Sequence, residues 1–183
     1  MVPRNIFFTK GVGVHRDKLE SEDLALRNAG VSHLNLRLVS GVYPPGCRRI
    51  TRPEEGPKSI PAGAEVASLY IQESTNEPNR LVVAALGVAI PADQDQHGIM
   101  FVYRAFGETD EKAGEYVEDR AATRLADSLG IEFDPDTAWD EKEQLFKMSG
   151  KIVRTFNVTQ SAVGNKDGLW TTVFTGAIFP DEA

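Results

Sequence analysis

The apolar run from Leu81 to Ile90 constrains the fold more than any other feature of the sequence. A short run with no polar side chain is typical of a central β-strand that is covered on both faces. Other layers of structure must therefore pack on either side of the sheet that contains it. The run is about half the length that a membrane-spanning helix needs, and Gly87 interrupts it. It therefore does not predict a membrane span.

Two helices are expected. In the longer, from Asp110 to Leu129, apolar residues recur at every fourth position, namely at Ala113, Val117, Ala121, Leu125 and Leu129. Thr109 can cap the start of this helix, and Gly130 can end it. The second helix is expected from Asp17 to Ala29, with Gly30 as its C-terminal signal.

The remaining apolar segments predict strands, which with the central run make about seven. They are Asn5–Val14, Leu34–Val39, Ala64–Gln72, Ile99–Phe106, Lys151–Ala162 and Leu169–Phe179. Arg52–Ala62 is expected to be a loop, and Asp134–Gly150 a polar connector with one or two helical turns. Because the helices lie between blocks of adjacent strands, the sequence predicts an α/β (α+β) sandwich of sheet and helix layers. We expect a single domain over residues 1–183.

Charge and cysteine content narrow the class of protein. The formal net charge is -7 and no Lys/Arg cluster is present, so we expect no nucleic-acid partner. Cys47 is the only cysteine, which argues against a disulfide-stabilised secreted protein. His15, His33 and His97 do not have the spacing of metal ligands, so no metal site is expected. With no signal-like amino terminus, the protein is expected to be cytoplasmic, with no membrane partner.

Several short segments form an ordered set along the chain. They are Asp23–Gly30, Asn35–Leu36, Val39–Pro45, Gly87–Pro91, Phe106–Gly114 and Gly168–Val173. In this order they resemble the pyruvoyl-dependent arginine decarboxylase family, in which an Asn-Leu pair precedes the pattern Ser-Ser-Ile/Val-x-Pro-Pro. The resemblance covers nearly the whole chain. It implies an αββα sandwich that assembles as a homotrimer or a dimer of trimers, with active sites between neighbouring subunits.

The family is a group of carboxy-lyases that convert arginine to agmatine and carbon dioxide in polyamine metabolism. The resemblance implies that the enzyme cleaves itself at a Ser-Ser bond: the hydroxyl of the second serine attacks the preceding carbonyl, and β-elimination leaves a pyruvoyl group. In this chain the first position is Ser40 and the second is Gly41. Glycine has no β-carbon, so it can form neither the ester nor the pyruvoyl group. We therefore expect no cofactor in this chain.

A second position also lacks a residue that the chemistry of the family needs. The family places a glutamate, its proton donor, four residues after the glycine that begins the strand following Ala-Ile-Pro. Counted from Gly98, this position is Val102, which cannot transfer a proton. An acid from Glu108, Asp110 or Glu111 remains an alternative at this point.

Other site positions of the family are retained. By the resemblance, Asp23 matches the acid that holds the guanidinium group of the substrate, a role that suits a carboxylate. Asn35 matches the asparagine near the reaction centre, and Leu26 the apolar wall. The residues that would hold the ligand are therefore present, whereas two that perform the chemistry are absent.

These residues predict an unprocessed, catalytically inactive homologue that keeps the fold and an arginine or agmatine pocket. It would act as a pseudoenzyme, either as a ligand sensor or as a regulatory or structural trimer partner of an active paralogue. Two alternatives stay open. Gly41 could be a substitution that turns a genuine arginine decarboxylase into a processing-defective variant. Ser40 could instead cleave its own bond to Val39, which would displace the pyruvoyl group by about 3.5 Å along the chain.

Overall fold

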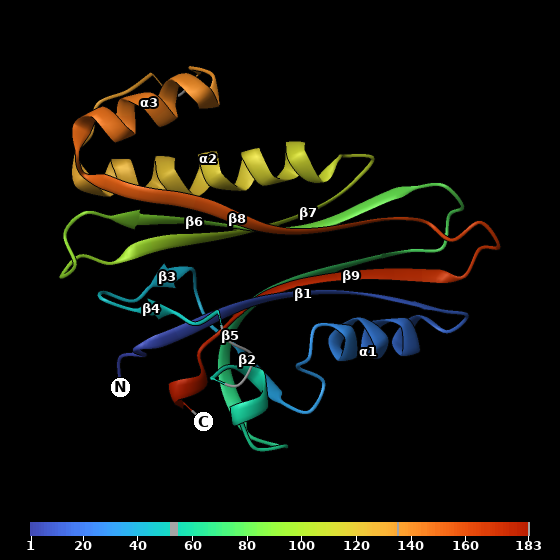
Figure 1. Ribbon diagram of the computed structural model, residues 1–183. Helices are drawn as coiled ribbons and strands as arrows, with labels where there is room; N and C mark the ends of the chain where they lie inside the picture. The colour runs from blue at the N-terminus through green and yellow to red at the C-terminus, as the bar shows by residue number, and fades with distance from the viewer. Residues whose placement is uncertain (52–54, 135, 183) are drawn as a thin grey trace.

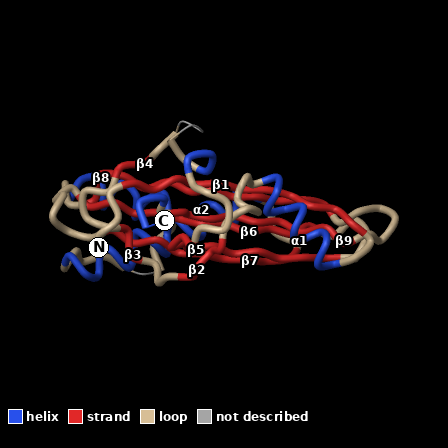
Figure 2. Tube along the Cα trace, turned by 90° about the horizontal axis from the view of Figure 1, so that it is seen from below, coloured by secondary structure: helices blue, strands red, loops and turns tan. Residues whose placement is uncertain are grey.

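The computed structural model describes residues 1–51, 55–134 and 136–182, and it has four layers. Two β-sheets pack face to face, and one helix covers the outer face of each; a third helix is stacked on one of these helices (Figure 1). This arrangement confirms the predicted αββα sandwich. The N- and C-terminal ends lie close together at one end of the sandwich (Figures 1 and 2), where the Asp181 carboxylate accepts hydrogen bonds from the backbone of Arg4 and Asn5.

The first sheet has the strand order β2-β5-β9-β1-β4. Its strands are β1 (Asn5–His15), β2 (Asn35–Leu38), β4 (Arg48–Arg49), β5 (Glu65–Thr75) and β9 (Trp170–Ile178). Its outer face is covered by helix α1 (Lys18–Asn28), which lies across β1 and β9. A side chain at Gly13 would collide with the Ser21 carbonyl, so this glycine allows the helix backbone to approach the strand closely.

The second sheet has the order β3-β7-β6-β8. Its strands are β3 (Val42–Tyr43), β6 (Leu81–Pro91), β7 (Gly98–Phe106) and β8 (Ile152–Val163). Helix α2 (Asp110–Leu129) covers its outer face, and helix α3 (Trp139–Ser149) packs on α2. The predicted central strand is confirmed, because the apolar residues of β6 are buried between the other sheet and α2.

The predicted elements occur with small shifts at their ends, and α2 has the predicted boundaries. The Thr109 hydroxyl accepts a hydrogen bond from the backbone NH of Lys112, and Gly130 has the left-handed conformation that ends the helix. The two-residue strands β3 and β4 were not predicted. They flank the adjacent prolines Pro44 and Pro45 and are too short to have a pattern of their own.

The prediction for Asp134–Gly150 was wrong in part, because this segment contains the three-turn helix α3. Besides the apolar packing of Phe146, its attachment to α2 includes Lys142, whose side chain is 5% exposed and whose Nζ lies 2.8 Å from Asp119 Oδ1. The predicted loop at Arg52–Ala62 includes a 3-10 turn at Pro57–Ser59, and its residues 52–54 lie outside the described residues. No helix in the described ranges is long and apolar enough to cross a membrane.

Candidate functional site

The segment that links β2 to β3 joins the two sheets. The backbone NH of Val39 donates to the Ser68 carbonyl of the first sheet, at 2.9 Å. Two residues later, the Gly41 carbonyl accepts from the Met100 NH of the second sheet, also at 2.9 Å. Between these bonds the Val42 NH donates to the Ser40 carbonyl, which closes a tight turn centred on Gly41. The backbone is therefore fixed on both sides of the Ser40–Gly41 bond.

Gly41 has no room for a side chain. A β-carbon built on its backbone would lie closer than 3.0 Å to the backbone carbonyl oxygen of Met100, a separation that real β-carbons do not show. The obstacle is backbone in the middle of a hydrogen-bonded strand, so a rotamer change cannot remove it. Any residue other than glycine would have to displace either this turn or β7.

Ser40 lies at the surface. It lines an apolar pocket of about 320 Å³ together with the amino-terminal residues 1–3, Val39 and Phe179. Its hydroxyl makes no hydrogen bond within the described residues. A serine hydroxyl without a base beside it is a weak nucleophile.

Val102 is a partly buried residue that packs against the apolar core between the sheets. It lies in β7 opposite Leu86 of β6 and packs with the cluster that includes Met100 and Leu69, the residues that surround Gly41. The three acids considered as replacements lie elsewhere. Glu108 accepts a hydrogen bond from Tyr103, whose ring packs toward α2, and Asp110 and Glu111 form the first turn of that helix. None of them faces the space between the sheets.

Leu26 and Asn35 come together in a second pocket, of about 550 Å³, on the α1 side of the first sheet. Its wall is mixed in character, with apolar, amide, guanidinium and carboxylate side chains. The lining residues are Glu22, Leu26, Leu34, Asn35, Leu36, Arg37, Glu65, Tyr70 and Gln72. The Asn35 amide nitrogen donates to the Gly63 carbonyl at 2.8 Å, which orients its oxygen.

Asp23 does not line this pocket. Its carboxylate Oδ2 lies 2.6 Å from Nε of Arg27, one helical turn further along α1. The acid that the resemblance assigns to a substrate guanidinium therefore binds a guanidinium of its own chain. Both side chains are largely exposed, so this pair is weak and can exchange partners.

Comparison with known proteins decides the family. The sequence model of the pyruvoyl-dependent arginine decarboxylase family matches residues 5–183. The chain belongs to this family. It is 56% identical to a probable pyruvoyl-dependent arginine decarboxylase of Chloroherpeton thalassium, over 97% of each chain. It is 48% identical to pyruvoyl-dependent arginine decarboxylase 2 of Methanosarcina acetivorans, over 98% of this chain and 97% of the relative.

The residues at the turn do not fit the cofactor after which the pyruvoyl-dependent arginine decarboxylase family is named. A pyruvoyl group retains the α- and β-carbons of the residue from which it forms, and residue 41 has no β-carbon. The Met100 carbonyl occupies the place where that carbon would lie. We therefore derive no reaction step through a pyruvoyl group in this chain.

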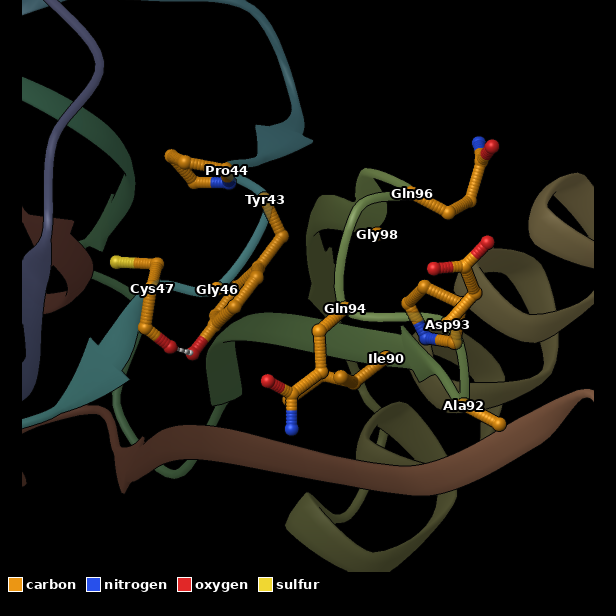
Figure 3. A pocket seen from close by; sticks show the side chains of 11 residues that line it. Tyr43, Pro44, Gly46, Cys47, Ile90, Ala92, Asp93, Gln94, Gln96 and Gly98 are labelled. Carbon is orange, nitrogen blue, oxygen red and sulfur yellow. Dashed lines mark hydrogen bonds between the residues drawn. The ribbon is translucent and has the colours of Figure 1, made fainter.

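A third pocket, which the sequence did not reveal, adjoins the turn in this family member. It has a volume of about 280 Å³ and lies between β3 and the β6–β7 connection (Figure 3). The Tyr43 hydroxyl donates to the Cys47 carbonyl at 3.0 Å. Burial, with a smaller contribution from Cys47, raises the pKa of Tyr43 to about 12, and burial also raises the pKa of Cys47 to about 12. Both groups are therefore neutral at pH 7, and Cys47 is not an activated nucleophile.

Proposed function

We propose that this chain is a non-processing member of the pyruvoyl-dependent arginine decarboxylase family that binds a guanidinium compound without decarboxylating it. The observation that carries the proposal is the collision at residue 41, where no side chain fits against the Met100 carbonyl. Self-cleavage needs a hydroxyl on a β-carbon at this position. Both the residue type and the space around it oppose that chemistry.

Val102 supports the same proposal independently. If this position corresponds to the acid of the family, the acid has been replaced by a residue that packs in the core. A carboxylate here would be costly to bury without a partner. Two positions of the reaction centre have thus become packing positions, which is expected of a chain that no longer performs the reaction.

The pocket beside Asn35 supports the binding part of the proposal. Glu22 and Glu65 line it with Leu26, so it offers carboxylates and an apolar wall to an arginine or agmatine side chain. Glu65 already holds the Arg37 guanidinium, with Nε 2.9 Å from Oε1. Assembly as a trimer or a dimer of trimers, with an active paralogue as a partner, remains part of the proposal, because it could place a neighbouring chain over this pocket.

Calorimetry with millimolar arginine and agmatine tests the binding proposal. We expect saturable heat for at least one of the two compounds, and about tenfold weaker binding to the Asn35→Ala variant, a loss of about 1.4 kcal/mol. Asn76→Ala, which removes an exposed asparagine with no side-chain hydrogen bond in the described chain, is the matched control and should bind like the original chain. No heat with either compound would exclude a guanidinium pocket.

A second candidate is a genuine arginine decarboxylase made inactive by one substitution at residue 41. Identities of 47–56% to relatives named as arginine decarboxylases favour it. Carbon dioxide release from arginine by the Gly41→Ser variant would support this candidate against our proposal. Cleavage without carbon dioxide release would implicate Val102, and adding Val102→Glu would then be the next step. We expect neither cleavage nor release from Gly41→Ser alone.

A further inference from the structure

Two arginines share one aromatic ring at the end of the sandwich where the termini lie. The guanidinium carbon of Arg49, in β4, lies 4.6 Å from the ring centre of Phe156, and that of Arg154, in β8, lies 5.0 Å from the same centre. Arg49 also lies 5.2 Å from the ring centre of Phe8, which meets Phe156 edge to face. Because both distances are measured from the same ring centre, the two guanidinium carbons are less than about 10 Å apart.

Neither of these arginines has a carboxylate partner within the described chain. This distinguishes them from the arginines that form ion pairs, which are Arg27, Arg37, Arg48, Arg80 and Arg104. Asp181 lies at the same end of the molecule, but its Oδ2 already accepts from the backbone NH groups of Arg4 and Asn5 at 2.7 and 2.6 Å, and its Oδ1 from the Asn5 side-chain amide at 2.8 Å. In a chain with more acidic than basic residues, two adjacent arginines without an acid are unusual.

The electrostatics at this position favour an anion. Burial, and then the charge of Arg154, lower the pKa of Arg49, so the protonated form of Arg49 is less stable here than in water. Arginine nevertheless stays charged at any physiological pH, so two like charges lie beside the same ring. Stacking on Phe156 offsets part of the repulsion. An anion that contacts both guanidiniums would offset much of the rest and could accept hydrogen bonds from each.

The pocket of Figure 3 lies beside this pair. Ile90, which lines the pocket, is the register partner of Arg154 across β6 and β8. Tyr43 lines it too, and the charges of both arginines act on the pKa of its hydroxyl, which places the phenol close to them. Ile90 and Pro91 give the cavity an apolar wall, and Gln94 adds an amide. The cavity can therefore receive the body of a small molecule whose anionic end reaches the arginines.

We propose that Arg49 and Arg154 form the anion-binding end of a site for a small organic carboxylate, whose body occupies the pocket lined by Tyr43, Ile90 and Gln94. Asp93 also lines this pocket. Its negative charge disfavours a second carboxylate in the pocket, so the site selects monocarboxylates. This site is separate from the pocket beside Asn35, with which it shares no lining residue.

An NMR titration of the full chain with butyrate tests the proposal, with the arginine Nε–H signals as the readout and chloride at equal ionic strength as the reference. We expect saturable shifts at Arg49 and Arg154, with a dissociation constant in the millimolar range, and at least tenfold weaker binding to Arg154→Gln and Arg49→Gln. Arg124→Gln is the matched control, because Arg124 also stacks on one ring, Phe101, at 4.9 Å. It should leave butyrate binding unchanged.

Three results would overturn the proposal. Shifts with butyrate that merely equal those with chloride would show that ionic strength alone moves the signals. Unchanged affinity in a folded Arg154→Gln variant would exclude the arginine pair as the binding group. Equal binding of succinate or inorganic phosphate would exclude the pocket as the place of the ligand body, because Asp93 and the apolar wall should discriminate against both.

Discussion

The turn at Gly41 and the pocket at Asn35 are six residues apart in the sequence but are built in opposite ways. At Gly41 the backbone is hydrogen-bonded toward both sheets and the space beside it is filled by the Met100 carbonyl. At Asn35 the strand lies at the edge of its sheet and borders a pocket with exposed carboxylates and amides. The first region excludes even a methyl group, whereas the second can accept a ligand.

Under the proposed function, this difference separates the positions of the lost chemistry from those of the retained binding. The positions assigned to the chemistry, Gly41 and Val102, contact the backbone of β7 and the apolar cluster between the sheets, where little change is tolerated. The positions assigned to ligand contact, Leu26 and Asn35, instead line the open pocket beside β2. Substitutions at the two regions should therefore have different consequences, mainly for stability at the first and mainly for binding at the second.

The largest effect is expected for Gly41→Ala. The added methyl group meets strand backbone, so we expect a loss of about 3 kcal/mol in the free energy of unfolding, measured by urea denaturation. Gly63→Ala is the matched control. Gly63 has a φ of +82° but open space around the site of a β-carbon, so it should lose only about 1 kcal/mol. Equal losses in the two variants would contradict the packing at Gly41.

A somewhat smaller effect is expected for Val102→Glu, about 2 kcal/mol at pH 7, because a carboxylate would enter an apolar cluster. Burial should raise the pKa of this glutamate in the folded state above its unfolded value. The deficit should therefore be small below pH 4 and grow as the pH rises through the raised pKa. Val163→Glu, at a position that is 57% exposed, should change stability by less than about 0.5 kcal/mol. A deficit independent of pH would argue against a buried carboxylate.

The smallest effect is expected for Arg27→Gln, which frees the Asp23 carboxylate from its ion pair. Because the pair is exposed, stability should change by less than about 0.5 kcal/mol. If Asp23 contributes to holding a guanidinium ligand, the affinity for agmatine should rise about threefold, as calorimetry would measure. Arg80→Gln breaks a similar exposed pair, with Glu77, and should leave the affinity unchanged. No gain in Arg27→Gln would remove Asp23 from the site.

The fold could be predicted well where local pattern and burial agree. Helix α2 has its apolar residues on one stripe, a capping threonine and a terminal glycine, and its ends were predicted without error. Helix α3 was underestimated because its burial depends on few residues. One of these is Lys142, which by its type is expected at the surface. Its partner Asp119 is 23 residues away, and no local pattern indicates that pairing.

The candidate site, like the fold, could be predicted from the sequence only in part. The order of short segments was enough to identify the family and to single out Gly41 and Val102. The sequence could not show that the Met100 carbonyl blocks residue 41, because that contact joins segments far apart in the chain that meet only through the pairing of β3 with β7. The arginine pair was also missed, since Arg49 and Arg154 are far apart in the chain and meet only through Phe156. Contacts of this kind depend on tertiary packing, which local propensity does not encode.

The most direct test of a non-processing chain is its intact mass under denaturing conditions, measured on protein kept without reductant or amine for several days. We predict one species at 20.1 kDa, the mass of the full chain. Two fragments that meet at Val39 and Ser40, the second with a blocked amino terminus, would contradict the account. They would show that Ser40 forms a pyruvoyl group and that the chain is a self-processing enzyme.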